Sequence, residues 1–264
     1  MPNEGTGSLP RILAIARNAF REAVRDRVLY NLIIFVLLIT IGAIFLGELT
    51  AGQEARVIVN LGLSAILIFG AFISIFVGVS LVWKEIEKRT VYSIFSKPVG
   101  RGEFIIGKYL GLCATLLFNV AVMGIGVTLA LVYVGGGELV GAMWAAVLLI
   151  FFELTIVTAV AILLSSFSSP ALSALLTFLV FLIGHFSSSL RDLAEGLGSR
   201  VAIIFFNGVY YLLPNLSHFS FITGTANGEV APLAMIGFAA VYAIVFDMIL
   251  ITITIAIFSR RNFK

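Results

Sequence analysis

The chain has 264 residues, of which 60% are hydrophobic and 12% are charged, and its mean hydropathy is +1.11. This composition excludes a water-soluble globular protein, because too little polar surface is present to cover so much apolar side chain. The net charge is +3, and the single cysteine, Cys113, excludes an internal disulfide and a multi-cysteine metal site. The sequence therefore predicts an all-α integral membrane protein.

The first predicted element is residues 9–27. Apolar side chains recur at three- and four-residue steps from Leu9 to Val24, and arginines and acids occupy the other positions. This pattern is typical of a basic amphipathic helix that lies flat on anionic lipid headgroups. The alternative is a helix that packs on a partner.

Membrane-spanning helices need about 20 mostly apolar residues. The segments that meet this requirement are residues 28–47, 57–83, 109–134, 139–164, 171–187 and 231–258. Pro170 separates the fourth segment from the fifth, and it suits the first turn of a helix because its missing N–H is not needed there. The sequence thus predicts six spans, with a tight turn between the fourth and fifth.

The positions of the basic residues predict the orientation. With both chain ends in the cytoplasm, all but three of the 17 lysines and arginines lie inside, the three being Arg56, Arg191 and Arg200. Cytoplasmic loops are enriched in these residues, so the bias favours an N-in, C-in topology. The expected location is a prokaryotic cytoplasmic (inner) membrane, crossed several times.

An outer loop is expected over residues 188–230. Its stretch 201–213 is too short to span and is expected to be interfacial or re-entrant. Aromatic side chains of this loop are expected at the headgroup boundary, as anchors or as a lid over a pathway: Phe205, Phe206, Tyr210, Tyr211, Phe219 and Phe221.

Two carboxylates fall inside predicted spans, Glu153 in the fourth and Asp247 in the sixth. A lone charge there is costly, so each must face a cavity, be paired, or be protonated. We expect no membrane-embedded basic residue to pair with them. They therefore form either a cation or proton site, or neutral acids that donate hydrogen bonds between helices.

No catalytic or metal-binding pattern is found. The histidines, His185 and His218, are far apart in sequence and are expected to make interfacial hydrogen bonds. Residues 102–109 nearly match a phosphate-binding loop, but Tyr109 stands where a serine or threonine would hold magnesium. Gly107 and Gly111 instead indicate a surface where two helices approach closely.

Residues 84–108 are the longest charged interruption, and charges exclude them from hydrocarbon. A short apolar patch lies between the charges and ends at Pro98, which disfavours helix at the residue before it. The patch consists of Val91, Tyr92, Ile94 and Phe95. The segment is predicted to be a short amphipathic helix with one apolar face for a partner.

This segment resembles the membrane subunit of an ATP-binding-cassette exporter of the type 2 permease family. The matching positions are Glu85 and Glu87 (an acidic pair), Thr90, Ser96-Lys97-Pro98 (a break), Arg101, and Gly107-Lys108-Tyr109-Leu110. Arg89 departs from the family's usual glycine, and Tyr92 stands near a common glutamate. The resemblance implies a coupling helix at about residues 89–96, seated in a groove of a separate ATPase subunit.

The resemblance also implies a second permease copy, identical or related, because each copy supplies half of a pathway. ATP and magnesium would bind the ATPase, so no cofactor, no enzymatic activity of this chain and no nucleic-acid partner are expected. Lipids are the remaining partner. The ATPase-coupling residues would be Glu85, Glu87, Arg89, Thr90, Val91, Tyr92, Ile94, Phe95, Lys97 and Arg101.

Two other functions stay open from the sequence. One is an ion-coupled secondary transporter that uses Glu153 and Asp247, although such proteins show internal repeats that are not found here. The other is a non-transporting membrane assembly protein that docks partners on its basic face. The substrate also stays open among lipid-like compounds, drugs and cations.

Overall fold

The structure is a computed structural model of the chain, and it describes residues 8–23, 34–35, 38–39, 42, 45, 52–87, 100–187, 208, 210 and 213–260. All regular structure in these parts is helical. The helices are α1 (Ser8–Ala23), α3 (Glu54–Glu87), α5 (Arg101–Tyr133), α6 (Val140–Ser165), α7 (Pro170–His185), α10 (Ile222–Ala226) and α11 (Leu233–Arg260), with short 3₁₀ turns η2 (Gly137–Leu139) and η3 (Leu216–Phe219).

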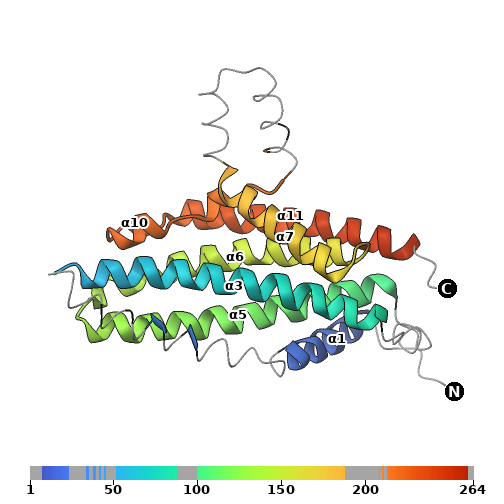
Figure 1. Cartoon of the computed structure of the whole chain (residues 1–264), viewed down its shortest axis with the longest axis horizontal. Helices are drawn as coiled ribbons and strands as arrows, with labels where there is room; N and C mark the ends of the chain where they lie inside the picture. The colour runs from blue at the N-terminus through green and yellow to red at the C-terminus, as the bar shows by residue number, and fades with distance from the viewer. Residues whose placement is uncertain are drawn as a thin grey trace.

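Four long apolar helices run side by side along the molecule: α3, α5, α6 and α11 (Figure 1). Each is long and apolar enough to cross a membrane, as predicted for the second, third, fourth and sixth spans. Helix α7 is shorter, with 16 residues, which correspond to about 24 Å of helix at 1.5 Å per residue.

The predicted first span, residues 28–47, lies mostly outside the described residues. Two observations concern its described positions. Phe35 is fully buried, and its ring meets that of Phe69 in α3 at 5.6 Å between centroids. This contact is one of the edge-on aromatic arrangements that stabilise packed helices.

Helix α6 forms the centre of the bundle. In its apolar stretch 72% of residues are buried, against 28% in α11, and it packs against α3, α5, α7 and α11. A helix that is hydrophobic all round is expected to be buried on all sides. Side chains projecting from α6 are therefore surrounded by protein, whereas much of α11 is exposed to the surroundings of the bundle.

The turn between α6 and α7 forms as predicted. Pro170 is the first residue of α7, and α6 ends at Ser165. Within the turn, Ser168 Oγ donates a hydrogen bond to the carbonyl oxygen of Leu164 at 2.8 Å. The two helices are consequently antiparallel neighbours, which places residues equally far from the turn close together.

The boundaries of the charged segment differ from the prediction. Helix α3 continues to Glu87, and α5 begins at Arg101, so much of residues 84–108 extends the neighbouring helices. The start of α5 is fixed locally, because Glu103 Oε2 accepts a hydrogen bond from the Gly100 N–H at 3.0 Å. Charges exclude a segment from lipid, but they do not end a helix that projects into water.

Helix α1 packs along α5. A methyl group added at Gly111 would lie 2.6 Å from the carbonyl oxygen of Ala16, and one at Gly107 would lie 2.7 Å from Ile15. The prediction that these glycines admit a second helix is confirmed, and that helix is the amphipathic one. Leu9 and Leu13 remain 70% and 61% exposed, so apolar surface is left for the lipid contact that we still predict.

Part of the predicted outer loop enters the bundle. Turn η3 packs against α6 and α7, and α10 packs against α3. Phe219, predicted at the headgroup boundary, is only 1% exposed, so this prediction is wrong. Its ring instead packs near Tyr242 of α11, because the chain before it lies against Gly184, where no side chain blocks the approach.

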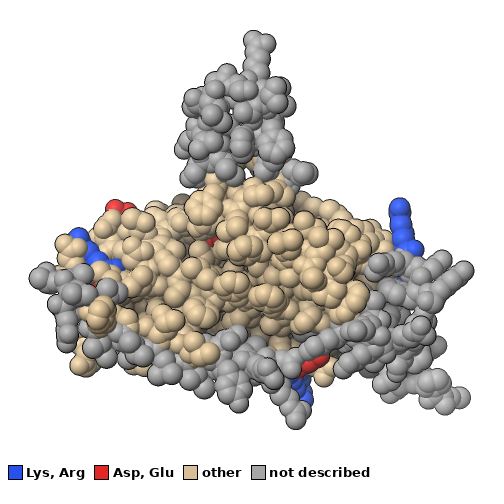
Figure 2. All heavy atoms as spheres, viewed as in Figure 1, with Lys and Arg blue, Asp and Glu red and all other residues tan. Residues whose placement is uncertain are grey.

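The charged side chains that are described gather near the ends of the bundle, and an uncharged band separates them (Figure 2). One end combines α1, the start of α5 and the end of α11 (Figure 1). The opposite end carries the turn between α5 and α6. This distribution is the one expected of helices that cross a bilayer.

Candidate functional site

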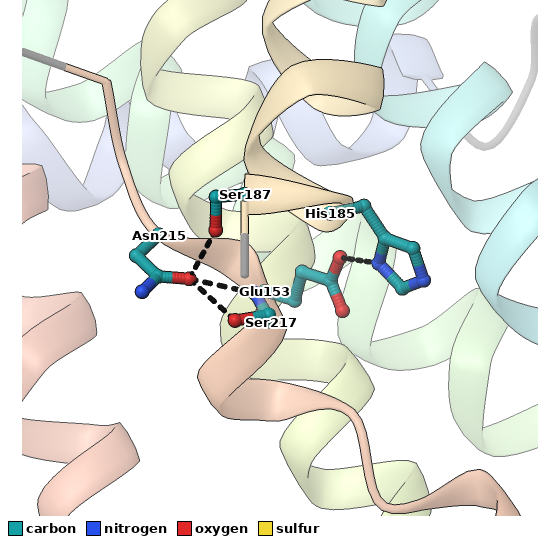
Figure 3. Close-up of polar contacts among 5 residues, drawn as sticks. All are labelled: Glu153, His185, Ser187, Asn215 and Ser217. Atoms are coloured by element: carbon teal, nitrogen blue, oxygen red, sulfur yellow. Dashed lines mark hydrogen bonds and ion pairs between the residues drawn. The ribbon is translucent and has the colours of Figure 1, made fainter. Parts of the chain in front are cut away.

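Glu153 lies at the middle of α6 and is fully buried. Its Oε1 is 3.1 Å from Nδ1 of His185, the last residue of α7, and the His185 side chain is 22% exposed (Figure 3). The rings of Phe181 and Phe186 flank the imidazole at 5.9 and 5.5 Å. The pair is thus held in apolar surroundings, where an unpaired carboxylate would be costly.

The sequence did not predict this pair, because we expected no basic partner for Glu153. The signal was nevertheless present in the tight turn. Glu153 lies 12 residues before the end of α6 at Ser165, and His185 lies 15 residues after the start of α7 at Pro170. In an antiparallel pair of helices these depths differ by about 4.5 Å, which is less than one helical turn.

A second polar cluster surrounds Asn215, which precedes η3 (Figure 3). Its Oδ1 accepts hydrogen bonds from the hydroxyls of Ser187 and Ser217, both at 2.6 Å. Its Nδ2 donates to the Tyr210 hydroxyl at 3.0 Å, and its backbone N–H donates to the Tyr242 hydroxyl at 3.0 Å. Asn215 therefore links the end of α7, the outer loop and α11.

His218 belongs to the same cluster, since its Nε2 is 3.0 Å from Asn215 Nδ2. The predicted role of His218 in local hydrogen bonding is confirmed, although the bond forms inside the folded outer segment. A buried polar network in which each member has a partner fixes one geometry of the chain. Here it fixes how η3 docks against α6 and α7.

Asp247 has different surroundings from Glu153. It lies midway along α11, is 7% exposed, and lines a cavity of about 530 Å³ bounded by α5, α6 and α11. The polar side chains that interact with it are those of Tyr109 and Thr155. Within the described parts of the chain, its Oδ1 has no hydrogen-bond partner.

The structure does not bring Glu153 and Asp247 into one site. Glu153 pairs with His185 on α7, whereas Asp247 faces a cavity that α7 does not line. In the described residues no group of three or more histidine, cysteine, aspartate and glutamate side chains is arranged to hold a metal ion. Any ligand of Asp247 must therefore be recognised chiefly by one carboxylate and an apolar wall.

Only part of the predicted ATPase-coupling set is described. Glu85 and Glu87 lie in the last turn of α3, and Arg101 opens α5. Arg101 Nη1 donates hydrogen bonds to the carbonyl oxygens of Ser259 and Phe258 at 2.5 and 3.4 Å, so it joins the start of α5 to the end of α11. The remaining predicted positions lie outside the described residues: Arg89, Thr90, Val91, Tyr92, Ile94, Phe95 and Lys97.

Lys108 was predicted in a water-exposed segment, but it is only 3% exposed. Its Nζ lies 3.6 Å from Glu22 Oε2 of α1, and 5.7 Å from the centre of the Phe104 ring. The ammonium group is covered because α1 packs over this turn of α5. Residues 102–109 are helical throughout, which agrees with the rejection of a phosphate-binding loop there.

A bundle of long apolar helices with charged ends and buried acids is that of a multi-pass membrane protein. A family model described as "ABC-2 family transporter protein" matches residues 13–262, so the chain belongs to that family. It is accordingly a membrane permease subunit of an ABC transporter.

Among curated proteins the chain is similar to a "Probable ABC transporter permease protein NosY" of Pseudomonas aeruginosa. The two are 29% identical over 107 residues. The matched region covers 39% of this chain and 39% of the relative, so the chain spans about two fifths of that protein's length in the match.

Proposed function

We propose that the chain forms half of the substrate pathway of an ABC-type exporter, and that a separate ATPase subunit docks on residues 84–108. In this proposal the chain has six spans with both ends in the cytoplasm of a prokaryotic cell. A second permease copy, identical or related, completes the pathway. ATP and magnesium bind the ATPase subunit and not this chain.

The observation that carries the proposal is the contact of Arg101 with the end of α11. The predicted docking segment lies between the end of α3 and the start of α5. Displacement of the segment would move these two helices directly, and through the Arg101 hydrogen bonds it would also move α11. Rigid helices joined in this way can pass a shift at one end to a distant site.

Helix α1 supports the same proposal. Its close packing at Gly107 and Gly111 and the ion pair between Glu22 and Lys108 tie it to the first turns of α5. The ATPase-facing end is therefore a connected unit of α1, α5 and α11. Such a unit can respond as one body to the binding and hydrolysis of ATP by a partner.

The experiment is co-purification of the ATPase with permease variants. Tyr92→Asp or Phe95→Asp places a charge on the apolar patch and should abolish association, because buried aromatic anchors dominate such interfaces. The matched control is Tyr133→Asp, at the opposite end of α5, where the side chain is 86% exposed. Undiminished co-purification with the two patch variants would contradict the proposal.

A further inference from the structure

We propose that the cavity around Asp247 binds an organic cation with an apolar body, and that such cations are the substrate class of the transporter. The inference rests on the proposed transport function. It names a ligand for a site that lies away from both the Glu153 and His185 pair and the ATPase-coupling end. The carboxylate, the lining and the opening of the cavity each support it.

The first step concerns the carboxylate. Asp247 stands 14 residues from either end region of a 28-residue helix, near the middle of the bilayer. It is 7% exposed, and among the described residues its Oδ1 accepts no hydrogen bond. The residues that line its cavity include no lysine or arginine. A positive group brought by a ligand would complete the environment of this acid.

The second step concerns the wall of the cavity. Tyr109, Phe151 and Phe152 contribute aromatic rings, and most of the remaining lining is aliphatic. Aromatic faces attract organic cations, most strongly where water is excluded. A cavity of about 530 Å³ with this lining suits a drug-sized molecule that is largely apolar.

The third step concerns access. Ile244 and Met248 lie beside Asp247 on α11, line the cavity, and are 56% and 58% exposed. The cavity therefore opens sideways on the apolar surface of the bundle, at the depth where lipid chains lie. An amphipathic cation that partitions into the bilayer can reach it without crossing water.

Other ligands fit less well. A bare metal ion such as Ca²⁺ requires about six or more oxygen ligands, whereas one carboxylate and the hydroxyls of Tyr109 and Thr155 are at hand. An anion would be repelled by Asp247. A neutral lipid would fill the apolar wall but leave the acid as it is.

The test is equilibrium binding of radiolabelled tetraphenylphosphonium to the full chain in phosphatidylcholine nanodiscs. This probe is a permanent cation with an apolar surface, and tetraphenylsilane is its neutral counterpart of similar shape. Wild-type protein should bind the cation saturably. Asp247→Asn should weaken the affinity at least about tenfold, Asp247→Glu should retain it, and the silane should compete poorly.

A matched control is Glu138→Gln, which removes a carboxylate at the end of the bundle, outside this cavity. It should leave the affinity unchanged. Equal binding by wild type and Asp247→Asn, equal competition by the silane, or no saturable binding would overturn the inference. So would loss of binding when a second permease copy is present, because that copy would then cover the cavity.

The inference and the proposed function fail separately. Co-purification of the ATPase tests the coupling end and does not depend on Asp247. If the complex assembles and hydrolyses ATP but tetraphenylphosphonium does not bind, the substrate class is wrong and the permease assignment stands. If the cation binds and no ATPase associates, the cavity stands and the coupling proposal fails.

Discussion

Glu153 lies in α6 at the centre of the bundle, whereas Asp247 lies in α11 at its edge. The first shares a hydrogen bond with His185, and the second faces a cavity with one oxygen unpartnered among the described residues. Both acids are buried, at 0% and 7% exposure. The difference indicates that burial alone does not assign a role to an acid inside a membrane, and that the identity of its neighbours does.

If Glu153 is structural, removal of its partner should have the largest effect. His185→Leu leaves a buried carboxylate unpaired and should lower the free energy of unfolding by about 3 kcal/mol. The measurement is unfolding of the purified protein in mixed micelles. The double variant Glu153→Leu with His185→Leu is the control and should recover most of the loss, because no buried polar group is left without a partner. A double variant as unstable as His185→Leu alone would show that the pair does not act as a unit.

The Asn215 cluster should show a smaller effect. Asn215→Ala removes the acceptor of the Ser187 and Ser217 hydroxyls and should cost about 2 kcal/mol in the same assay. The control is Asn227→Ala, in the turn after α10, where the side chain is exposed. If both alanine variants unfold alike, Asn215 does not fix the docking of η3.

The ion pair at the α1 end tests an intermediate environment. Glu22→Gln leaves Lys108 buried, but Glu22 is itself 38% exposed, so solvent screens the pair. The expected loss of stability is about 1 kcal/mol, and it should shrink when salt is added. A loss as large as that of His185→Leu would mean that α1 holds the bundle together more tightly than its exposure indicates.

The smallest change should come from Asp247. Asp247→Leu replaces an unpaired acid in an apolar cavity and should alter stability by less than about 1 kcal/mol. The same variant should lose binding of tetraphenylphosphonium. A loss of stability near 3 kcal/mol would break the comparison, because Asp247 would then be as structural as Glu153.

The long helices could be predicted from the sequence because a bilayer demands continuous apolar runs. Residues 139–164 and 231–258 were predicted as spans, and α6 and α11 cover Val140–Ser165 and Leu233–Arg260. The two acids could also be singled out, since charge inside such runs is costly. What each acid contacts depends on the rotation of the helices about their axes, and hydropathy alone does not fix that rotation.

The interior of the outer segment shows the same limit. Phe219 looks like a headgroup anchor in sequence, but it is buried because Asn215 and Gly184 let the preceding chain approach α7 closely. The burial of Lys108 likewise depends on α1, more than 80 residues earlier in the chain. Contacts between distant segments decide both positions.

The central claim is that the end carrying residues 84–108 faces the cytoplasm and receives an ATPase there. The most direct test is thiol labelling in cells of two variants, Lys97→Cys and Glu138→Cys, each in a Cys113→Ala background with a membrane-impermeant maleimide. We predict that position 97 reacts only after the membrane is permeabilised, and that position 138 reacts in intact cells. Labelling of position 97 from outside intact cells would contradict the orientation and, with it, the coupling of this permease to a cytoplasmic ATPase.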